Sequence, residues 1–170
     1  MTGVTLETRV ISDGAVRAFR ALQGVMGDTT PIMNAIGEGL VRGTHDRFRA
    51  GEDPDGTAWT PLNPAYAADK RGPGILRESA MKGGLMGSIT REAGPDQVRV
   101  GTNKIYAAVH QFGATIVPRT QSHLRFPLGG GWARADSVTI AARPYIGVSA
   151  DDARMIEEKV VDALDRRVGV

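Results

Sequence analysis

Three histidines are the side chains in this sequence best suited to acid–base chemistry near neutral pH. They stand at positions 45, 110 and 123, and no two have the His-x-x-x-His spacing of a shared metal site on a helix. His110 with Asp96 or Asp136 would be the centre of a small hydrolase, but no Gly-x-Ser-x-Gly nucleophile motif accompanies them. We favour packing or a local hydrogen bond for His110, with catalysis or metal binding as the alternative.

Carboxylates and glycines give no stronger signal for a bound ion or cofactor. Glu52, Asp53 and Asp55 resemble part of a calcium loop but lack the remaining ligands of that pattern. The glycine runs at 72–74 and 129–131 lack the Lys-Ser/Thr that completes a phosphate-binding loop. There is no cysteine for a thiolate site or a disulfide. We therefore expect no metal, no cofactor and no enzymatic activity.

Basic and aromatic side chains gather instead in residues 115–141. These include Arg119, Arg125, Phe126, Trp132 and Arg134. Such a stretch suits contact with an acidic protein surface or with nucleic acid. Three interpretations stay open: a solvated hairpin with ordinary surface charge, contact with another protein, and contact with DNA. The formal net charge of +2 is too small to favour nucleic acid by itself.

The composition indicates one folded domain over residues 1–170. The chain is 41% hydrophobic and 24% charged, which is enough apolar content for one core. No apolar run approaches the roughly 20 residues that span a bilayer, and no signal peptide is visible, so we expect no membrane association. Residues 1–28 would be an N-terminal extension of this domain.

The N-terminal half predicts a strand and two helices. Alternating apolar residues indicate a strand over 4–11, and helical spacing follows over 12–26. A second helix would have Thr30 as its N-cap and Pro31 in its first turn, and would end at Gly51. Its glycines at 37, 39 and 43 indicate close approach to a sheet or another subunit, or a marginal helix held by packing.

The middle of the chain alternates turns with short elements. Residues 52–64 have the composition of a loop that Trp59 would anchor, and Asn63 would cap a short helix over 64–70. Helical spacing continues over 76–89, and residues 88–101 predict a hairpin.

The stretch 97–114 is the predicted centre of packing. A strand over 97–100 leads to Thr102 and Asn103, which would cap a helix over 105–112 that ends at Gly113. Residues 115–141 then predict a long hairpin with a mobile, glycine-rich tip. The last helix would be capped by Ser149, and its apolar stripe would pack on a sheet.

Several motifs stand in a fixed order along the chain. They are Phe48 with Asp53–Gly56; Trp59–Leu62; Tyr66 and Lys70; Ile75-Leu76 with Leu85 and Ser88-Ile89; Val98–Asn103; Tyr106-Ala107 with His110–Gly113; and Ala142–Gly147. In order and spacing this set resembles the phage virion morphogenesis family, the Mu G-like and tail-completion group of head–tail joining proteins. The resemblance runs from about residue 30 to the C-terminus. The stretch Ser79–Leu85 is longer and more irregular than the family's Thr/Ser-Gly-x-Leu element.

The resemblance implies an α+β fold in which helices pack on a small curved antiparallel sheet, with a long flexible β-hairpin arm. It implies a structural protein of the virion head–tail junction, assembled in the host cytoplasm as a homo-oligomeric ring, which we expect to be a hexamer. Its partners would be neighbouring neck and tail proteins, with DNA passing through the lumen. The alternative is a DNA-binding accessory protein that acts through the arginine-bearing hairpin.

Two sets of residues are candidates for the site, the first from the resemblance and the second from the basic hairpin. The assembly and core signature is Trp59, Tyr106, His110, Gln111, Phe112, Gly113, Arg143 and Pro144. The contacts to a partner protein or to DNA would be Arg119, Arg125 and Arg134.

Overall fold

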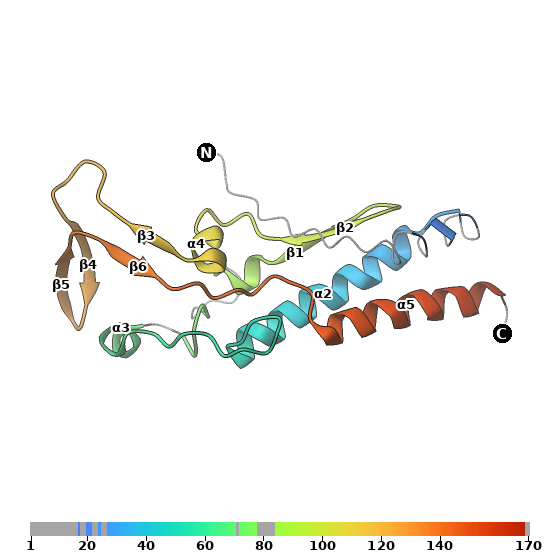
Figure 1. Cartoon of the computed structure of the whole chain (residues 1–170), viewed down its shortest axis with the longest axis horizontal. Helices are drawn as coiled ribbons and strands as arrows, with labels where there is room; N and C mark the ends of the chain where they lie inside the picture. Colours follow the sequence, from blue (N-terminus) through green and yellow to red (C-terminus); the bar gives the residue numbers. More distant parts are fainter. Residues whose placement is uncertain are drawn as a thin grey trace.

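The chain forms an elongated α+β structure with two long helices and one strand hairpin at one end and the other paired strands toward the opposite end (Figure 1). The computed structural model describes residues 17, 20, 21, 24, 27–70, 72–77 and 84–168. The predicted strand over 4–11 and most of the predicted helix over 12–26 lie outside these residues. The described elements are α2 (Thr30–Ala50), α3 (Pro64–Asp69), the 3₁₀ turn η1 (Met86–Ser88), β1 (Thr90–Ala93), β2 (Val98–Gly101), α4 (Ala107–Phe112), β3 (Ala114–Ile116), β4 (Leu124–Leu128), β5 (Gly131–Ala135), β6 (Val138–Ile140) and α5 (Ala150–Val168).

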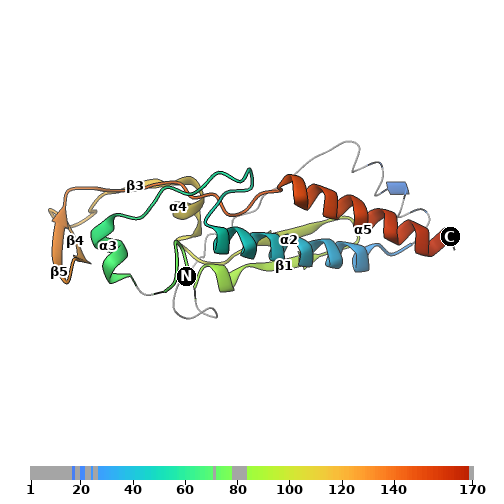
Figure 2. The same cartoon turned by 90° about the horizontal axis from the view of Figure 1, so that it is seen from below.

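Helix α2 lies between the β1–β2 hairpin and helix α5 (Figures 1 and 2). Its buried Ile32 and Ile36 pack with Ala163 of α5, and Val98 of β2 lies against the same cluster. The apolar stripe predicted for α5 contributes Ile156, Val160 and Leu164. It packs mainly on helix α2, whereas the sequence predicts packing on a sheet. Each Å² of apolar surface buried in this cluster contributes roughly 25 cal/mol to the free energy of folding of the helical end.

The ends of α2 follow from local hydrogen bonds. Gly51 has left-handed φ and ψ of 76° and 40°, and its N–H donates to the Arg47 carbonyl over 2.7 Å, so the predicted end is confirmed. At the start, Thr29 rather than Thr30 occupies the cap position. The Asp28 carboxylate accepts the Thr30 N–H over 2.9 Å, and this hydrogen bond holds the pKa of Asp28 below its usual value.

Close approach explains the glycines within α2. A Cβ at Gly37 would lie 2.7 Å from Arg91 Cδ of β1 and 2.7 Å from Val98 Cγ2 of β2. A Cβ at Gly39 or Gly43 would press on side chains of α5. The close approach predicted from the sequence is therefore made to a hairpin and a helix of the same chain.

A buried ion pair joins the end of α2 to the start of α5. The Ser149 hydroxyl accepts the Asp152 N–H over 3.1 Å, which confirms Ser149 as the cap, and the Asp152 carboxylate accepts the Ser149 N–H over 3.0 Å. The same carboxylate pairs with Arg47, and both side chains are only 6% exposed. Arg47 Nη1 also donates to the Tyr145 carbonyl over 3.1 Å. The sequence pattern did not reveal this ion pair.

Two predicted helices differ in the structure. Thr102 accepts the Lys104 N–H over 3.2 Å and hydrogen-bonds Ser88, so it orders a turn, and α4 begins two residues later than predicted. In the predicted helix over 76–89, residues 75–76 form a turn and 86–88 a single 3₁₀ turn; the middle lies outside the described residues. Glycines at 83, 84 and 87 reduce helix propensity there. By contrast, α3 and its Asn63 cap are confirmed.

The strands confirm an α+β fold, and within the described residues they pair as three two-stranded antiparallel sheets: β1–β2, β3–β6 and β4–β5. The hairpin predicted over 115–141 consists of the last two pairs, with β4–β5 nested beyond β3–β6. Strand β3 ends at Ile116, because Pro118 has no N–H to continue the ladder. We call residues 114–140 the arm.

Replacing Asp152 with Asn should lower the free energy of unfolding by about 3–5 kcal/mol, because the buried Arg47 guanidinium loses its counter-charge. Asp151→Asn is the matched control. Asp151 pairs with Arg154 at the surface, and its loss should cost less than about 0.5 kcal/mol. Urea denaturation measures both values, and equal effects would contradict the structural role of the buried pair.

Candidate assembly site: a buried joint and a projecting arm

Three chain segments converge between the helical end and the arm. Residues 59–61, 107–113 and 142–147 meet there, and we call this contact the joint. Its apolar core consists of Phe48, Trp59, Leu85, Met86, Ile89, Ala107, Tyr145 and Ile146. The Phe48 ring lies 5.6 Å from Trp59, edge to face, and 5.1 Å from Tyr145. Aromatic pairs of this geometry add about 0.5–1.5 kcal/mol beyond the area they bury.

The buried amide of Gln111 binds the backbone of the third segment at three points. Its Oε1 accepts the N–H groups of Tyr145 and Ile146 over 3.0 and 3.1 Å. Its Nε2 donates to the Ile146 carbonyl over 2.9 Å. An extended segment beside a short helix has no ladder partner for these groups, so the side chain replaces a neighbouring strand.

Arg143 and Trp59 bind the first and third segments together. Arg143 Nε and Nη2 donate to the carbonyls of Thr60 and Pro61 over 2.9 and 3.2 Å. Trp59 Nε1 donates to the Pro144 carbonyl over 2.8 Å. Burial lowers the pKa of Arg143 from its ordinary value.

Tyr145 is the part of the joint that our predicted signature omitted. It is fully buried, and its hydroxyl donates to the Ala107 carbonyl over 3.2 Å. Burial, with a smaller effect of Tyr106, raises the pKa of Tyr145 to about 12. Its position in the Arg-Pro-Tyr-Ile motif is the sequence feature that could have identified it as part of the joint. A phenol that stays protonated below this pH acts as a fixed hydrogen-bond donor.

The remaining signature residues surround the joint. The His110 carbonyl accepts the Arg143 N–H over 2.7 Å, and the His110 ring contacts Tyr106 edge to face at 5.9 Å. Gly113 has a φ of 73°, and a Cβ there would lie 2.9 Å from the Ala142 nitrogen. Phe112 is 67% exposed and faces away from this core.

Two of the carboxylates considered for catalysis or metal binding have structural contacts, Asp136 and Asp53. Asp136 pairs with His123, with 2.7 Å between Oδ1 and Nδ1. Asp53 Oδ1 accepts the N–H groups of Asp55 and Thr57, both over 2.9 Å, and so orders the turn. Within the described part of the chain, no group of three or more His, Cys, Asp or Glu side chains is arranged to hold a metal ion.

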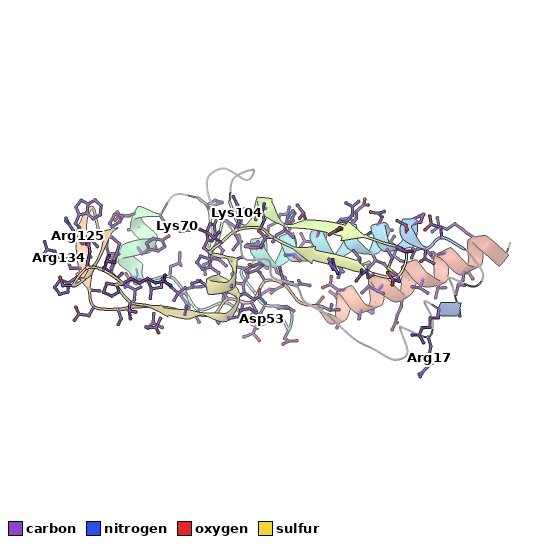
Figure 3. All side chains as sticks on the ribbon, turned by 90° about the horizontal axis from the view of Figure 1, so that it is seen from above. Arg17, Asp53, Lys70, Lys104, Arg125 and Arg134 are labelled. Atoms are coloured by element: carbon purple, nitrogen blue, oxygen red, sulfur yellow. The ribbon has the colours of Figure 1, made fainter. Side chains whose placement is uncertain are left out.

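The arm brings two of the three predicted contact arginines together. Arg125 and Arg134 are directly opposed in the β4–β5 ladder, and Figure 3 shows both at the far end of the molecule. The Arg125 guanidinium lies 5.4 Å from the centre of the Trp132 ring, which is 70% exposed. Arg119 is exposed in the connection between β3 and β4 and is not part of this ladder.

Fold and joint together define an elongated α+β protein in which buried polar side chains bind backbone groups of their own chain. Residues 12–165 match the phage virion morphogenesis family, and the chain belongs to that family. The match starts closer to the N-terminus than the motifs that carried the resemblance, which begin near residue 30.

Two curated relatives cover most of the chain. The putative capsid assembly protein G of Escherichia phage Mu is 30% identical over 173 residues, covering 97% of this chain and 96% of the relative. The Mu-like prophage FluMu G protein 2 of Haemophilus influenzae is 28% identical over 145 residues, covering 85% of each. No solved structure matches this chain. None of the described helices has the length and apolar character to cross a membrane.

Gly113→Ala should destabilise the protein more than Gly130→Ala, although both glycines have φ near 75°. A Cβ at Gly130 meets nothing within 4 Å, so only backbone strain of about 1–2 kcal/mol applies. A Cβ at Gly113 also collides with the backbone of residues 140 and 142, which adds about 1–3 kcal/mol. Thermal and urea unfolding of the two variants measure the difference. Equal losses would mean that the joint is not tightly packed at this position.

Proposed function

We propose that this protein is a structural subunit of the phage head–tail junction, where it completes the tail or neck so that a filled head joins it. It works there as a homo-oligomeric ring, a hexamer in this proposal. Family membership and the similarity to protein G of phage Mu, whose name describes capsid assembly, support a place in virion assembly.

The arrangement of the joint and the arm carries this proposal. Seven of the eight signature residues contribute hydrogen bonds, ring contacts or close backbone packing at the joint, and the arm projects from it. Among the described strands, β4 and β5 pair only with each other. The ribbon contacts α3, where Asp69 accepts the Gly130 N–H over 2.8 Å. Isolated two-stranded ribbons are marginally stable in water, so a neighbouring surface would stabilise this one. An arm held by a rigid joint suits contact between subunits.

The proposed role is structural and involves no reaction and no cofactor. His110 and the carboxylates discussed above serve packing and turn formation in this account. The partners are further copies of the chain and the neighbouring neck and tail proteins, and DNA passes through the ring. The site of action is the virion, after assembly in the host cytoplasm.

Particles made without this protein test the proposal. Electron micrographs of a lysate in which the gene carries an early stop codon should show filled heads and tails that are not joined. Supplying the wild-type protein from a plasmid is the control and should restore complete virions. Normal virions without the protein would contradict a role in joining.

A DNA-binding accessory protein is the second candidate, and one observation favours it. The exposed Trp132 beside Arg125 and Arg134 combines a stacking surface with two cations. Phosphate contacts weaken steeply with salt, so a salt-dependent mobility shift with duplex DNA separates this candidate from the first.

A further inference from the structure

One face of the β4–β5 ribbon is exposed and carries an unusual set of side chains. Side chains alternate between the two faces of a strand, so Arg125 and Pro127 share a face with their cross-strand partners Arg134 and Trp132. We call these four residues the arm face. All four are exposed, whereas Leu124, Phe126 and Leu128 on the other face are half-buried. The ribbon therefore turns its charged and aromatic side outward.

The arm face has uncompensated positive charge. Like charges directly opposite each other destabilise a ladder, and Arg125 faces Arg134 in this position. Among the described residues, neither guanidinium has a carboxylate partner within ion-pair distance. An acidic surface placed over both arginines would remove this repulsion. The adjacent Trp132 offers a large apolar contact of the kind that dominates interface energies.

The same chain has an acidic groove that matches these requirements. It lies between the end of α2, the turn at 52–56 and the start of α5, and its volume is about 360 Å³. Its lining includes six carboxylates: Asp46, Glu52, Asp53, Asp55, Asp151 and Asp152. Arg47 is the one basic side chain in the lining, and it pairs with Asp152. Asp46 and Asp151 pair at the surface with Arg49 and Arg154, which leaves an excess of negative charge from Glu52, Asp53 and Asp55. Asp55 and Asp151 are exposed at the groove.

The two surfaces cannot meet within one molecule. Figure 3 shows Arg125 and Arg134 at one end of the long axis and Asp53 far from them, beyond the base of the arm. Figure 1 places β4 and β5 at that same end, away from the start of α5. Contact between two different patches on successive copies is a head-to-tail interface, and repetition of such a contact closes a ring when the rotation permits.

We propose that the arm face of one subunit docks into the acidic groove of a second copy. The contact rests on the ring of the proposed function and identifies the two surfaces that form it. Trp132 supplies the apolar centre, and the two arginines pair with exposed carboxylates of the groove. These are Asp55, and Asp151, which exchanges its surface pairing with Arg154 for an arginine of the arm. Electrostatic complementarity of this kind fixes the register and the choice of partner.

Another basic surface, a groove lined by arginines, is a weaker candidate than the arm face for binding to the acidic groove. It has a volume of about 590 Å³ and lies between α2 and the start of β1. Two of its arginines, Arg49 and Arg91, already pair with Asp46 and Glu38 of the same chain at 2.5 Å. The arm face has no such internal compensation in the described residues, so it gains more from an acidic partner.

Charge exchange between the two surfaces tests the contact. Arg125→Glu with Arg134→Glu gives an arm-reversed chain. Asp46→Lys with Asp55→Lys and Asp151→Lys gives a groove-reversed chain, in which three carboxylates remain against Arg47 and three lysines. Each alone should associate at least about tenfold more weakly than the wild type, because like charges then meet at the interface. An equal mixture should associate again, since each arm now meets a groove of opposite sign. Analytical ultracentrifugation over a concentration series, with circular dichroism to verify folding, measures this.

Glu157→Lys with Glu158→Lys is the matched control, because it reverses two exposed charges on α5 outside the groove and should leave association unchanged. Assembly that persists in both reversed chains would overturn the contact and leave the ring intact. A wild type that stays monomeric at every concentration would overturn both the contact and the ring. Loss of association without recovery in the mixture, together with arm-dependent binding of a duplex DNA probe, would assign the arm face to nucleic acid instead.

Discussion

A single buried side-chain amide, that of Gln111, fixes the path of the chain on which both ends of the molecule depend. It satisfies two N–H groups and one carbonyl of residues 145–146, which would otherwise be buried without partners. Leaving a buried polar group unsatisfied costs about 1–3 kcal/mol each. No apolar residue replaces this function, and a shorter amide does not reach as far from the helix.

The joint connects the two ends mechanically because the same segment takes part in both. Upstream, Gly113 leads from α4 into β3, and β6 returns to Ala142 beside it, so the joint holds both strands at the base of the arm. Downstream, the Tyr145 carbonyl accepts from Arg47 of α2, and the same guanidinium pairs with Asp152 of α5. Displacing residues 143–147 would therefore disturb the arm and the helices together.

Local signals predicted much of this structure, and long-range contacts account for what they missed. Pro31 and Gly51 delimited α2, Asn63 capped α3, and Ser149 capped α5, because each depends on residues within a few positions. Thr102 had the chemistry of a helix cap, but Ser88, fourteen residues away, binds its hydroxyl. The described strands form separate two-stranded sheets and not one sheet. Strand periodicity predicts strands but does not predict which strands pair with each other.

At the candidate site, too, local patterns predict which residues matter, and long-range contacts decide how they are arranged. Motif order identifies the signature residues, but no local pattern indicates a partner for Gln111 or Arg143, because their acceptors lie 35 and 83 residues away. The ion pair of Arg47 and Asp152 spans 105 residues and followed from no local pattern. The arginines of the arm were predicted as a group. The strand register, which is known only from the structure, shows that Arg125 and Arg134 oppose each other and that Arg119 is outside the ladder.

Native-state amide hydrogen exchange tests most directly whether the joint is the constraint that holds the molecule together. Amides of Arg143, Tyr145 and Ile146 should exchange only by global unfolding, with the same free energy of opening as the centre of α2. Amides of the β4–β5 ribbon should open at lower free energy. Exchange of the joint amides through local opening, several kcal/mol below the value for α2, would contradict this account.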